Sequence, residues 1–259
     1  MEQGKVILIL CDGMRPDALE QVAPPLYRHI RREGAWAMDA RSVMPPVTLP
    51  AHVSLMQSVD PQRHGILTNT YTPQSRPIEG LFDQLHREGK TCAFFYNWDE
   101  LRDLSRPGSL NWYGFSSGVE GGFEKTDEES LAAARACLAA HNPDFLFLYL
   151  GAPDEAGHEI GWMTEPYLRS VAACWDRITA LCSDLSAADH VLITADHGGH
   201  GRDHGLDIPE DMTIPLLLSG PRFAGRGQLT GVSIKDIAPT VTALLGVRPS
   251  PRWEGRSLL

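Results

Sequence analysis

Acidic and imidazole side chains come directly after three short apolar runs of the sequence. They are Asp12 after residues 6–11, Asp154 and His158 after residues 145–150, and Asp196 and His197 after residues 191–194. Carboxylate and imidazole groups suit Zn²⁺, or Mn²⁺ and Mg²⁺ where oxygen ligands dominate. A single aspartate after a strand is usually a helix cap, but three such positions together favour a metal site.

The spacing within each Asp/His pair fits a shared ion. Asp154 and His158 are four residues apart, so a helical turn places them on one side of a helix. Asp196 and His197 are adjacent, and adjacent side chains reach one ion only from a loop or a strand end. Asp196 and His197 meet this requirement, because they lie at the end of the apolar run at residues 191–194.

A hydroxyl group for nucleophilic chemistry is available at Thr48, in a segment rich in proline. Threonine is a poor nucleophile unless a base or a metal ion lowers the pKa of its hydroxyl group. Taken alone, Thr48 is more typical of the first residue of a helix. Asn97 and Trp98 follow the apolar run at residues 91–96, where either side chain could reach over a site. Stacking on a substrate and packing in the core are equal alternatives for Trp98.

The elements that must position these residues alternate along the chain. Apolar runs typical of strands buried on both faces lie at residues 6–11, 91–96, 145–150, 191–194 and 214–219. Helical periodicity lies at residues 78–88, 127–141 and 167–185. This alternation predicts an α/β fold with a doubly wound, mostly parallel central sheet and helices on both faces. We expect a single domain over residues 1–259, with a variable, loop-rich segment around residues 99–125.

Charge and cysteine content narrow the class of protein. The chain has 23 Lys and Arg against 33 Asp and Glu, so its formal charge is 23 − 33 = −10, which argues against binding a nucleic-acid polymer. Five scattered cysteines without a Cys-x-x-Cys pair predict buried free thiols in a reducing compartment rather than a disulfide framework. The sequence shows neither a secretory signal nor an apolar run that could span a membrane, so a cytoplasmic location is expected. The sequence leaves the oligomeric state open.

Five motifs occur in an order that is typical of one group of enzymes. They lie at residues 7–15, 48–52 with 64–69, 153–158, 196–198 and 236–258. With them the chain resembles the alkaline phosphatase superfamily, and within it the type I phosphodiesterase / nucleotide pyrophosphatase branch. The resemblance implies an alkaline phosphatase-like fold. It also implies a metal-dependent phosphodiesterase or nucleotide pyrophosphatase that acts on a small phosphorylated substrate.

The resemblance further implies two divalent cations side by side, with Zn²⁺ favoured and Mn²⁺ as the alternative. One ion would be bound by Asp12, Thr48, Asp196 and His197, and the other by Asp154, His158 and a third histidine. Thr48 would attack phosphorus and form a phospho-threonine, while the amide of Asn69 would donate a hydrogen bond to a phosphoryl oxygen.

Two histidines compete for the third position of the second metal site. His204 is favoured because the apolar run at residues 214–219, which follows it, resembles the segment that follows the loop of the third histidine across the superfamily. Its loop is also long enough to turn back toward the site. His200 would then lie beside the metal ligands or near the leaving group, or else face solvent.

Other activities on the same residues remain open. A phosphomonoesterase or a phosphonate hydrolase would use the same site, and a metal-binding module without catalysis is an alternative from a different class. A sulfatase is disfavoured, because Thr48 stands where sulfatases need a Cys or Ser that becomes formylglycine. Diesters are favoured over monoesters, because no Lys or Arg follows Thr48 before Arg63 to balance the extra negative charge of a monoester.

Overall fold

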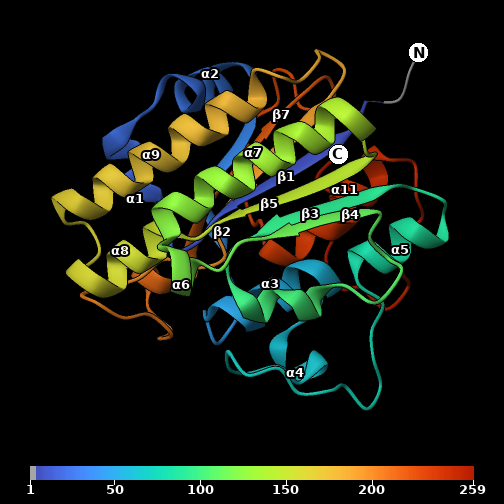
Figure 1. Cartoon of the computed structure of the whole chain (residues 1–259), viewed down its shortest axis with the longest axis horizontal. Coiled ribbons are helices and arrows are strands. Elements are labelled where there is room, and N and C mark those ends of the chain that lie inside the picture. Colours follow the sequence, from blue (N-terminus) through green and yellow to red (C-terminus); the bar gives the residue numbers. More distant parts are fainter. Residues whose placement is uncertain (1–3) are drawn as a thin grey trace.

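A computed structural model describes residues 4–259, and the strands of this part of the chain form one sheet (Figure 1). The strands are β1 (Val6–Cys11), β2 (Ala35–Arg41), β3 (Cys92–Tyr96), β4 (Trp112–Phe115), β5 (Phe145–Leu150), β6 (His190–Thr194), β7 (Thr213–Ser219) and β8 (Gly227–Gln228). Their order is β4-β3-β5-β1-β6-β7-β2-β8. From β4 to β6 all neighbours pair in parallel, whereas β7 is antiparallel to both β6 and β2. The predicted mostly parallel sheet is confirmed.

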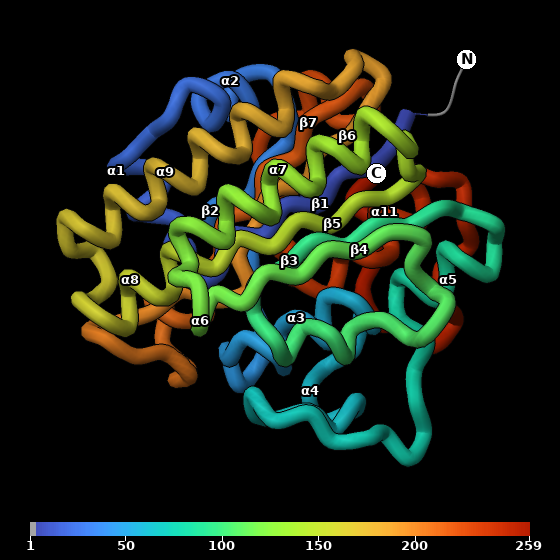
Figure 2. The backbone as a smooth tube through the Cα atoms, viewed as in Figure 1, coloured from blue at the N-terminus to red at the C-terminus, as the bar shows by residue number. Residues whose placement is uncertain are grey.

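Helices cover both faces of the sheet. They are α1 (Pro16–Val22), α2 (Pro25–Glu33), α3 (Thr48–Gln57), α4 (Pro61–His64), α5 (Leu81–Arg87), α6 (Gly118–Gly121), α7 (Phe123–His141), α8 (Ala152–Ile160), α9 (Glu165–Cys182), α10 (Pro209–Met212) and α11 (Ile237–Leu244), with the 3-10 helices η1 (Asp99–Leu104) and η2 (Ile234–Asp236). The long helices α7 and α9 run side by side across one face, while α3, α5 and α11 pack on the other. The connection from α4 to α5 runs along the outside of the molecule (Figure 2).

Burial explains why the central strands read as uninterrupted apolar runs. Every residue of β1 and of β5 is buried, because helices cover the sheet above and below these strands. The five predicted strands and three predicted helices are all present, with ends that differ by at most four residues from the predicted ranges.

Two parts of the sheet were not predicted. β2 is a strand of alternating burial that pairs antiparallel with β7 and carries an irregularity between Ala37 and Ala40, so its apolar pattern is broken. The segment at residues 99–125, expected to be rich in loops, contains η1, β4, α6 and the first turn of α7. β4 is an edge strand with two exposed residues of four, which is why it lacks the apolar run of a central strand.

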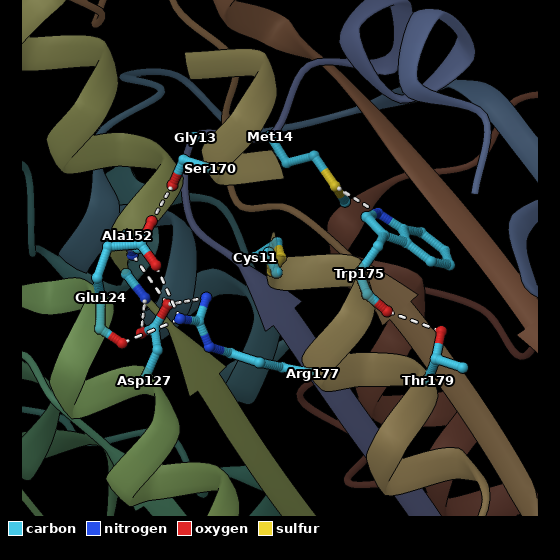
Figure 3. Close-up of a disulfide and its surroundings, with 12 residues drawn as sticks. Cys11, Gly13, Met14, Glu124, Asp127, Ala152, Ser170, Trp175, Arg177 and Thr179 are labelled. Carbon is cyan, nitrogen blue, oxygen red and sulfur yellow. Dashed lines mark hydrogen bonds and ion pairs between the residues drawn. A yellow bond between two sulfur atoms is a disulfide. The ribbon is translucent and has the colours of Figure 1, made fainter. Parts of the chain in front are cut away.

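The expectation of free thiols throughout is wrong for two cysteines. Cys11 at the end of β1 forms a disulfide with Cys174 on α9 (Figure 3), whereas Cys92, Cys137 and Cys182 are free. The two bonded residues are 163 positions apart, and they meet because α9 packs on β1, a contact that cysteine spacing does not reveal. Among residues 4–259, no helix is both long and apolar enough to cross a lipid bilayer.

Candidate active site

Three neighbouring strands bring the predicted acidic and histidine residues together. β5, β1 and β6 are adjacent and parallel, so their carboxyl ends meet at one edge of the sheet. Asp12 follows β1 directly, and Asp196 and His197 follow β6 after one residue. Asp154 lies in the first turn of α8, which begins two residues after β5. The topology therefore places all three segments around one point.

The first group of side chains contains Asp12, Asp154 and His197, whose ligand atoms all lie within 4.8 Å of one another. His197 Nε2 is 3.4 Å from Asp12 Oδ1 and 3.3 Å from Asp196 Oδ2. The hydroxyl oxygen of Thr48 is 3.1 Å from the same nitrogen atom. The other three residues predicted for the first ion thus lie around His197 Nε2.

The second group contains Asp154, His158 and His204, whose ligand atoms also lie within 4.8 Å of one another. His158 Nε2 is 3.4 Å from Asp154 Oδ2, as expected for residues one helical turn apart. The ring of His204 stacks on that of His197, with ring centroids 3.7 Å apart. Asp154 belongs to both groups and connects them.

The histidine rings are oriented by the backbone. In each ring Nδ1 lies within hydrogen-bond distance of a carbonyl oxygen: that of Gly198 for His197 at 2.8 Å, that of Arg202 for His158 at 3.1 Å and that of Pro46 for His204 at 2.9 Å. A carbonyl oxygen only accepts, so Nδ1 carries the proton and Nε2 presents a lone pair to the site. Burial also lowers the pKa of His197 and His204, which keeps both rings neutral. Neutral imidazole is the form that binds a metal ion.

The aspartates lie in an environment that disfavours three negative charges. Burial raises the pKa of Asp12 and Asp154 well above the usual range, and the charge of Asp196 raises both further. Burial raises the pKa of Asp196 to about 7. Within residues 4–259, Asp12 Oδ1, Asp154 Oδ1 and Asp196 Oδ2 accept no hydrogen bond. Buried carboxylate oxygens without donors are the observation that a bound cation would explain.

Gly13 allows the segments to approach closely. Its φ of +65° lies in the left-handed region, and a Cβ atom there would lie 2.9 Å from Asp154 Oδ1. Its N–H donates to Asp196 Oδ1 at 3.3 Å, while the indole N–H of Trp162 and the hydroxyl of Tyr167 donate to its carbonyl oxygen. The positions of these two aromatic residues depend on how α9 and the preceding loop pack, so their role is not evident from the sequence.

Tyr149 is a further site residue that sequence reasoning missed. Its hydroxyl group donates to Asp12 Oδ2 and thereby orients that carboxylate. Tyr149 is the fifth residue of β5, and in sequence it is one member of an apolar run. The signal available was a hydroxyl-bearing residue close to the carboxyl end of a strand that leads into the site.

Thr48 and Asn69 lie together at a small cavity. Thr48 is the first residue of α3, after Val47 in an extended conformation. The side-chain oxygen of Asn69 accepts from the N–H of Leu49 at 3.0 Å, which leaves the amide NH₂ group of Asn69 to donate elsewhere. The cavity has a volume of about 210 Å³ and is lined by Asp12, Thr48, Asn69, Trp98, Val119, Phe123, Tyr149, Gly151, Asp154, Glu155, His158 and His204.

Of the three remaining candidate residues, one lines the cavity and two do not. Trp98 lines the cavity, whereas Asn97 does not: it is fully buried and donates to Thr126 and Asp127. His200 also lies outside the cavity, because its ring pairs with the carboxylate of Asp211 at 2.8 Å. Of the two competing histidines, the structure brings His204 to Asp154 and His158.

Known proteins resemble this chain in sequence over most of its length. The family model "Type I phosphodiesterase / nucleotide pyrophosphatase" matches residues 6–209. The curated ectonucleotide pyrophosphatase/phosphodiesterase family member 1 of Mus musculus is 24% identical over 223 residues, which cover 76% of this chain and 24% of that protein. The chain therefore spans about a quarter of the length of this relative.

Solved structures share the fold. Murine ectonucleotide pyrophosphatase/phosphodiesterase 5, an inactive variant in complex with AMP, superposes with a TM-score of 0.81 and 16% identity over 97% of both chains. A 2-O GAG sulfatase superposes with a TM-score of 0.76 and 16% identity over 99% of this chain and 73% of the sulfatase. The alkaline phosphatase-like fold and the resemblance inferred from the motifs are both confirmed. The chain belongs to the type I phosphodiesterase / nucleotide pyrophosphatase family.

Proposed function

We propose that this chain hydrolyses phosphodiesters of small molecules with Thr48 as the nucleophile and two divalent cations as cofactors, Zn²⁺ rather than Mn²⁺. One ion is assigned to Asp12, Thr48, Asp196 and His197, and the other to Asp154, His158 and His204. The observation that carries the proposal is the position of the Thr48 hydroxyl group, 3.1 Å from His197 Nε2 and at the wall of the cavity that Asp12 and Asp154 also line.

The donor set fits divalent cations. Three aspartates with carboxylate oxygens that accept no hydrogen bond from residues 4–259 face three histidines whose Nδ1 atoms are held by backbone carbonyl oxygens, so that Nε2 of each ring is directed to the site. Mixed carboxylate and imidazole donors suit Zn²⁺. When bound, the ions supply positive charge that lowers the pKa of a hydroxyl group or water and offsets the charge of the phosphoryl group.

The residues of the chain perform the remaining tasks. Thr48 lies at the amino end of α3, where the helix dipole favours negative charge on its oxygen atom. Its hydroxyl group loses its proton and its oxygen atom attacks phosphorus, while the bond from phosphorus to the leaving oxygen breaks. The leaving alcohol takes up a proton, and the phospho-threonine that forms still carries the other ester group. Water then attacks this phosphorus, which releases the phosphomonoester and restores Thr48. The free amide group of Asn69 donates to a phosphoryl oxygen as charge develops there.

The cavity supports a diester rather than a monoester. Among the described residues that line it there is no Lys or Arg, while Glu155 adds a further acidic group. Arg202 does not extend into the cavity; it donates to the carbonyl oxygen of His158 at 2.8 Å. A monoester dianion would meet more repulsion here than a diester monoanion.

Hydrolysis of two chromogenic substrates tests the proposal. With Zn²⁺ supplied, we expect a higher kcat/KM for bis(p-nitrophenyl) phosphate than for p-nitrophenyl phosphate. Thr48→Ala should lower the rate by several orders of magnitude, since the covalent route loses its acceptor. The control Thr72→Ala changes an exposed threonine outside the cavity and should retain the wild-type rate.

Four outcomes would contradict parts of the proposal, provided that a p-nitrophenyl phosphonate is assayed beside the two phosphate esters. Near-wild-type turnover by Thr48→Ala would remove Thr48 as nucleophile. A higher kcat/KM for the monoester would favour a phosphomonoesterase, and turnover confined to phosphonates would favour a phosphonate hydrolase. Zinc binding without hydrolysis of any of these compounds would favour a metal-binding module.

A further inference from the structure

Helix α8 carries Asp154 and His158 but cannot cap its own amino end. Its N-cap residue is Gly151, which has no side chain, and Pro153 has no N–H group. A larger residue does not fit at position 151, because a Cβ atom there would lie 2.6 Å from the ring of Phe123. The free backbone N–H groups at the start of a helix need acceptors, so another segment must supply them.

Asp127 of α7 supplies these acceptors from outside the helix. Its side chain is fully buried, and Oδ1 accepts from the N–H of Gly151 at 2.8 Å while Oδ2 accepts from that of Ala152 at 3.3 Å. Asn97 donates to Oδ1 at 2.7 Å. Figure 3 shows Asp127 and Ala152 directed toward each other from two different helices.

A cation on a third helix compensates the buried charge. Arg177 of α9 places Nη1 4.0 Å from Asp127 Oδ2, and its other amino group is bound by the carboxylate of Glu124 at 2.7 Å (Figure 3). The groups around the carboxylate are donors or cations, which favours its ionised form. Burial nevertheless raises the pKa of Asp127 to about 7, which shows how costly the charge is at this position.

We propose that Asp127 is a positioning residue for the second metal site: by capping α8 from α7, it fixes the first turn of the helix and with it Asp154 and His158. This inference rests on the metal centre of the proposed function. Asp154 is two residues beyond the capped N–H of Ala152, and a metal ligand has to be held to within about 0.5 Å. Asp127 itself does not line the cavity, so it acts through α8 and not on the substrate.

Isothermal titration calorimetry tests this role. Zinc is added to the metal-free full chain at about pH 8, where the carboxylate of Asp127 is ionised. We compare wild type, Asp127→Asn and the control Glu129→Gln, which changes an exposed acid on the same helix. Asparagine keeps the shape and one acceptor but places an NH₂ group against the N–H of Ala152. We expect one of the two ions to bind ten- to a hundredfold more weakly in Asp127→Asn, and both affinities to be unchanged in Glu129→Gln.

The outcomes separate positioning from simple stabilisation. If Asp127→Asn lowers Tm but leaves both stepwise affinities at the wild-type values, Asp127 only stabilises the fold and the inference is overturned. Equal weakening of both ions would also overturn it, because α8 contributes two of the three residues of the second group, Asp154 and His158, but only Asp154 to the first. If wild type itself binds no zinc, the metal centre fails and the positioning role fails with it, a result distinct from a defect confined to Asp127→Asn.

Discussion

His200 and His204 show how two similar residues a few positions apart acquire different environments. His204 Nδ1 donates to the carbonyl oxygen of Pro46, so its other nitrogen faces Asp154 and His158. His200 instead pairs with the buried carboxylate of Asp211, and that pair lies outside the cavity. The residue type does not distinguish the two histidines; the partner of Nδ1 does, a backbone carbonyl oxygen for His204 and a carboxylate oxygen for His200.

Metal content separates the two histidines. We expect His204→Ala to lose about one zinc ion per chain, because the second group loses one of three donors. His200→Ala should keep both ions. Measurement is by atomic absorption after zinc loading and removal of excess metal. The opposite pattern would assign the second site to His200.

Lowering the pH should destabilise the folded protein, because His64 becomes protonated. This residue does not belong to either metal group. Its Nδ1 accepts from the N–H of Ile66, and Nε2 lies 3.0 Å from Ser54 Oγ, so the ring is neutral. Burial lowers the pKa of His64 from 6.5 to about 4. The unfolded chain therefore binds a proton before the folded chain does, and stability is lost as pH falls from about 6.5 to about 4.

The expected contribution of His64 is about 3 kcal/mol over that range, at about 1.4 kcal/mol per pKa unit. It is measured as the difference in unfolding free energy between wild type and His64→Gln, which cancels the other titrating groups. The difference should shrink as the pH falls. A difference that is constant with pH would contradict the lowered pKa.

Much of the candidate site could be predicted at the level of single residues. Asp12, Asp154 and Asp196 stand directly after apolar runs, and parallel pairing is enough to bring such positions together. Tyr149 and Asp127 could not be predicted, because each acts through a contact between elements far apart in the chain. The contacts of Asn97 could not be predicted for the same reason: its partners lie on α7.

At the level of elements, strands buried on both faces were predictable and edge strands were not. β1 and β5 are apolar throughout because both faces are covered. β8 has only two residues, and β4 exposes every second residue, so neither has a distinct pattern. The spacing of Asp154 and His158 predicts a helical turn where α8 lies, although the sequence of α8 has no apolar periodicity that would predict the whole helix.

Helix α8 should tolerate no side chain at Gly157. A Cβ atom there would lie 2.6 Å from the indole ring of Trp162, although alanine favours helices by about 1 kcal/mol over glycine. We expect Gly157→Ala to destabilise the chain by roughly 1–3 kcal/mol through overpacking. Urea unfolding with a chelator present measures it, so that loss of metal does not contribute.

The control for this substitution is Glu159→Ala on the exposed face of the same helix. It should change the unfolding free energy by less than about 0.5 kcal/mol. If Gly157→Ala were as stable as wild type or more so, the ring of Trp162 would have to move away without cost.

At the level of the whole molecule, three aspartates of an acidic chain are gathered at one edge of the sheet. The chain has a formal charge of −10, and three of its carboxylates meet in the site with raised pKa values. The disulfide between Cys11 and Cys174 ties the strand that leads to Asp12 to helix α9. The fold therefore holds these charges together through the packing of its central strands and long helices.

Zinc should stabilise the folded chain. A cation that binds the native state alone adds about 2.7 kcal/mol at a free concentration of 100 times Kd. We expect Tm to rise with zinc concentration and to fall on chelation, as measured by differential scanning calorimetry. In Asp154→Asn, which changes the residue common to both groups, the rise should be much smaller. A Tm independent of zinc would contradict the metal centre.

The strand order has a consequence for how this molecule can change. The ligand-bearing segments leave from β5, β1 and β6 in the middle of the sheet, whereas β4 and β8 form its margins and carry none of them. At the turn that leads into β4, Pro107 and Gly108 are exposed, and the space around Gly108 is open. Additions at such a margin leave the centre undisturbed. A reporter domain grafted between Pro107 and Gly108 would enlarge the molecule while the spacing of its ligands stayed the same.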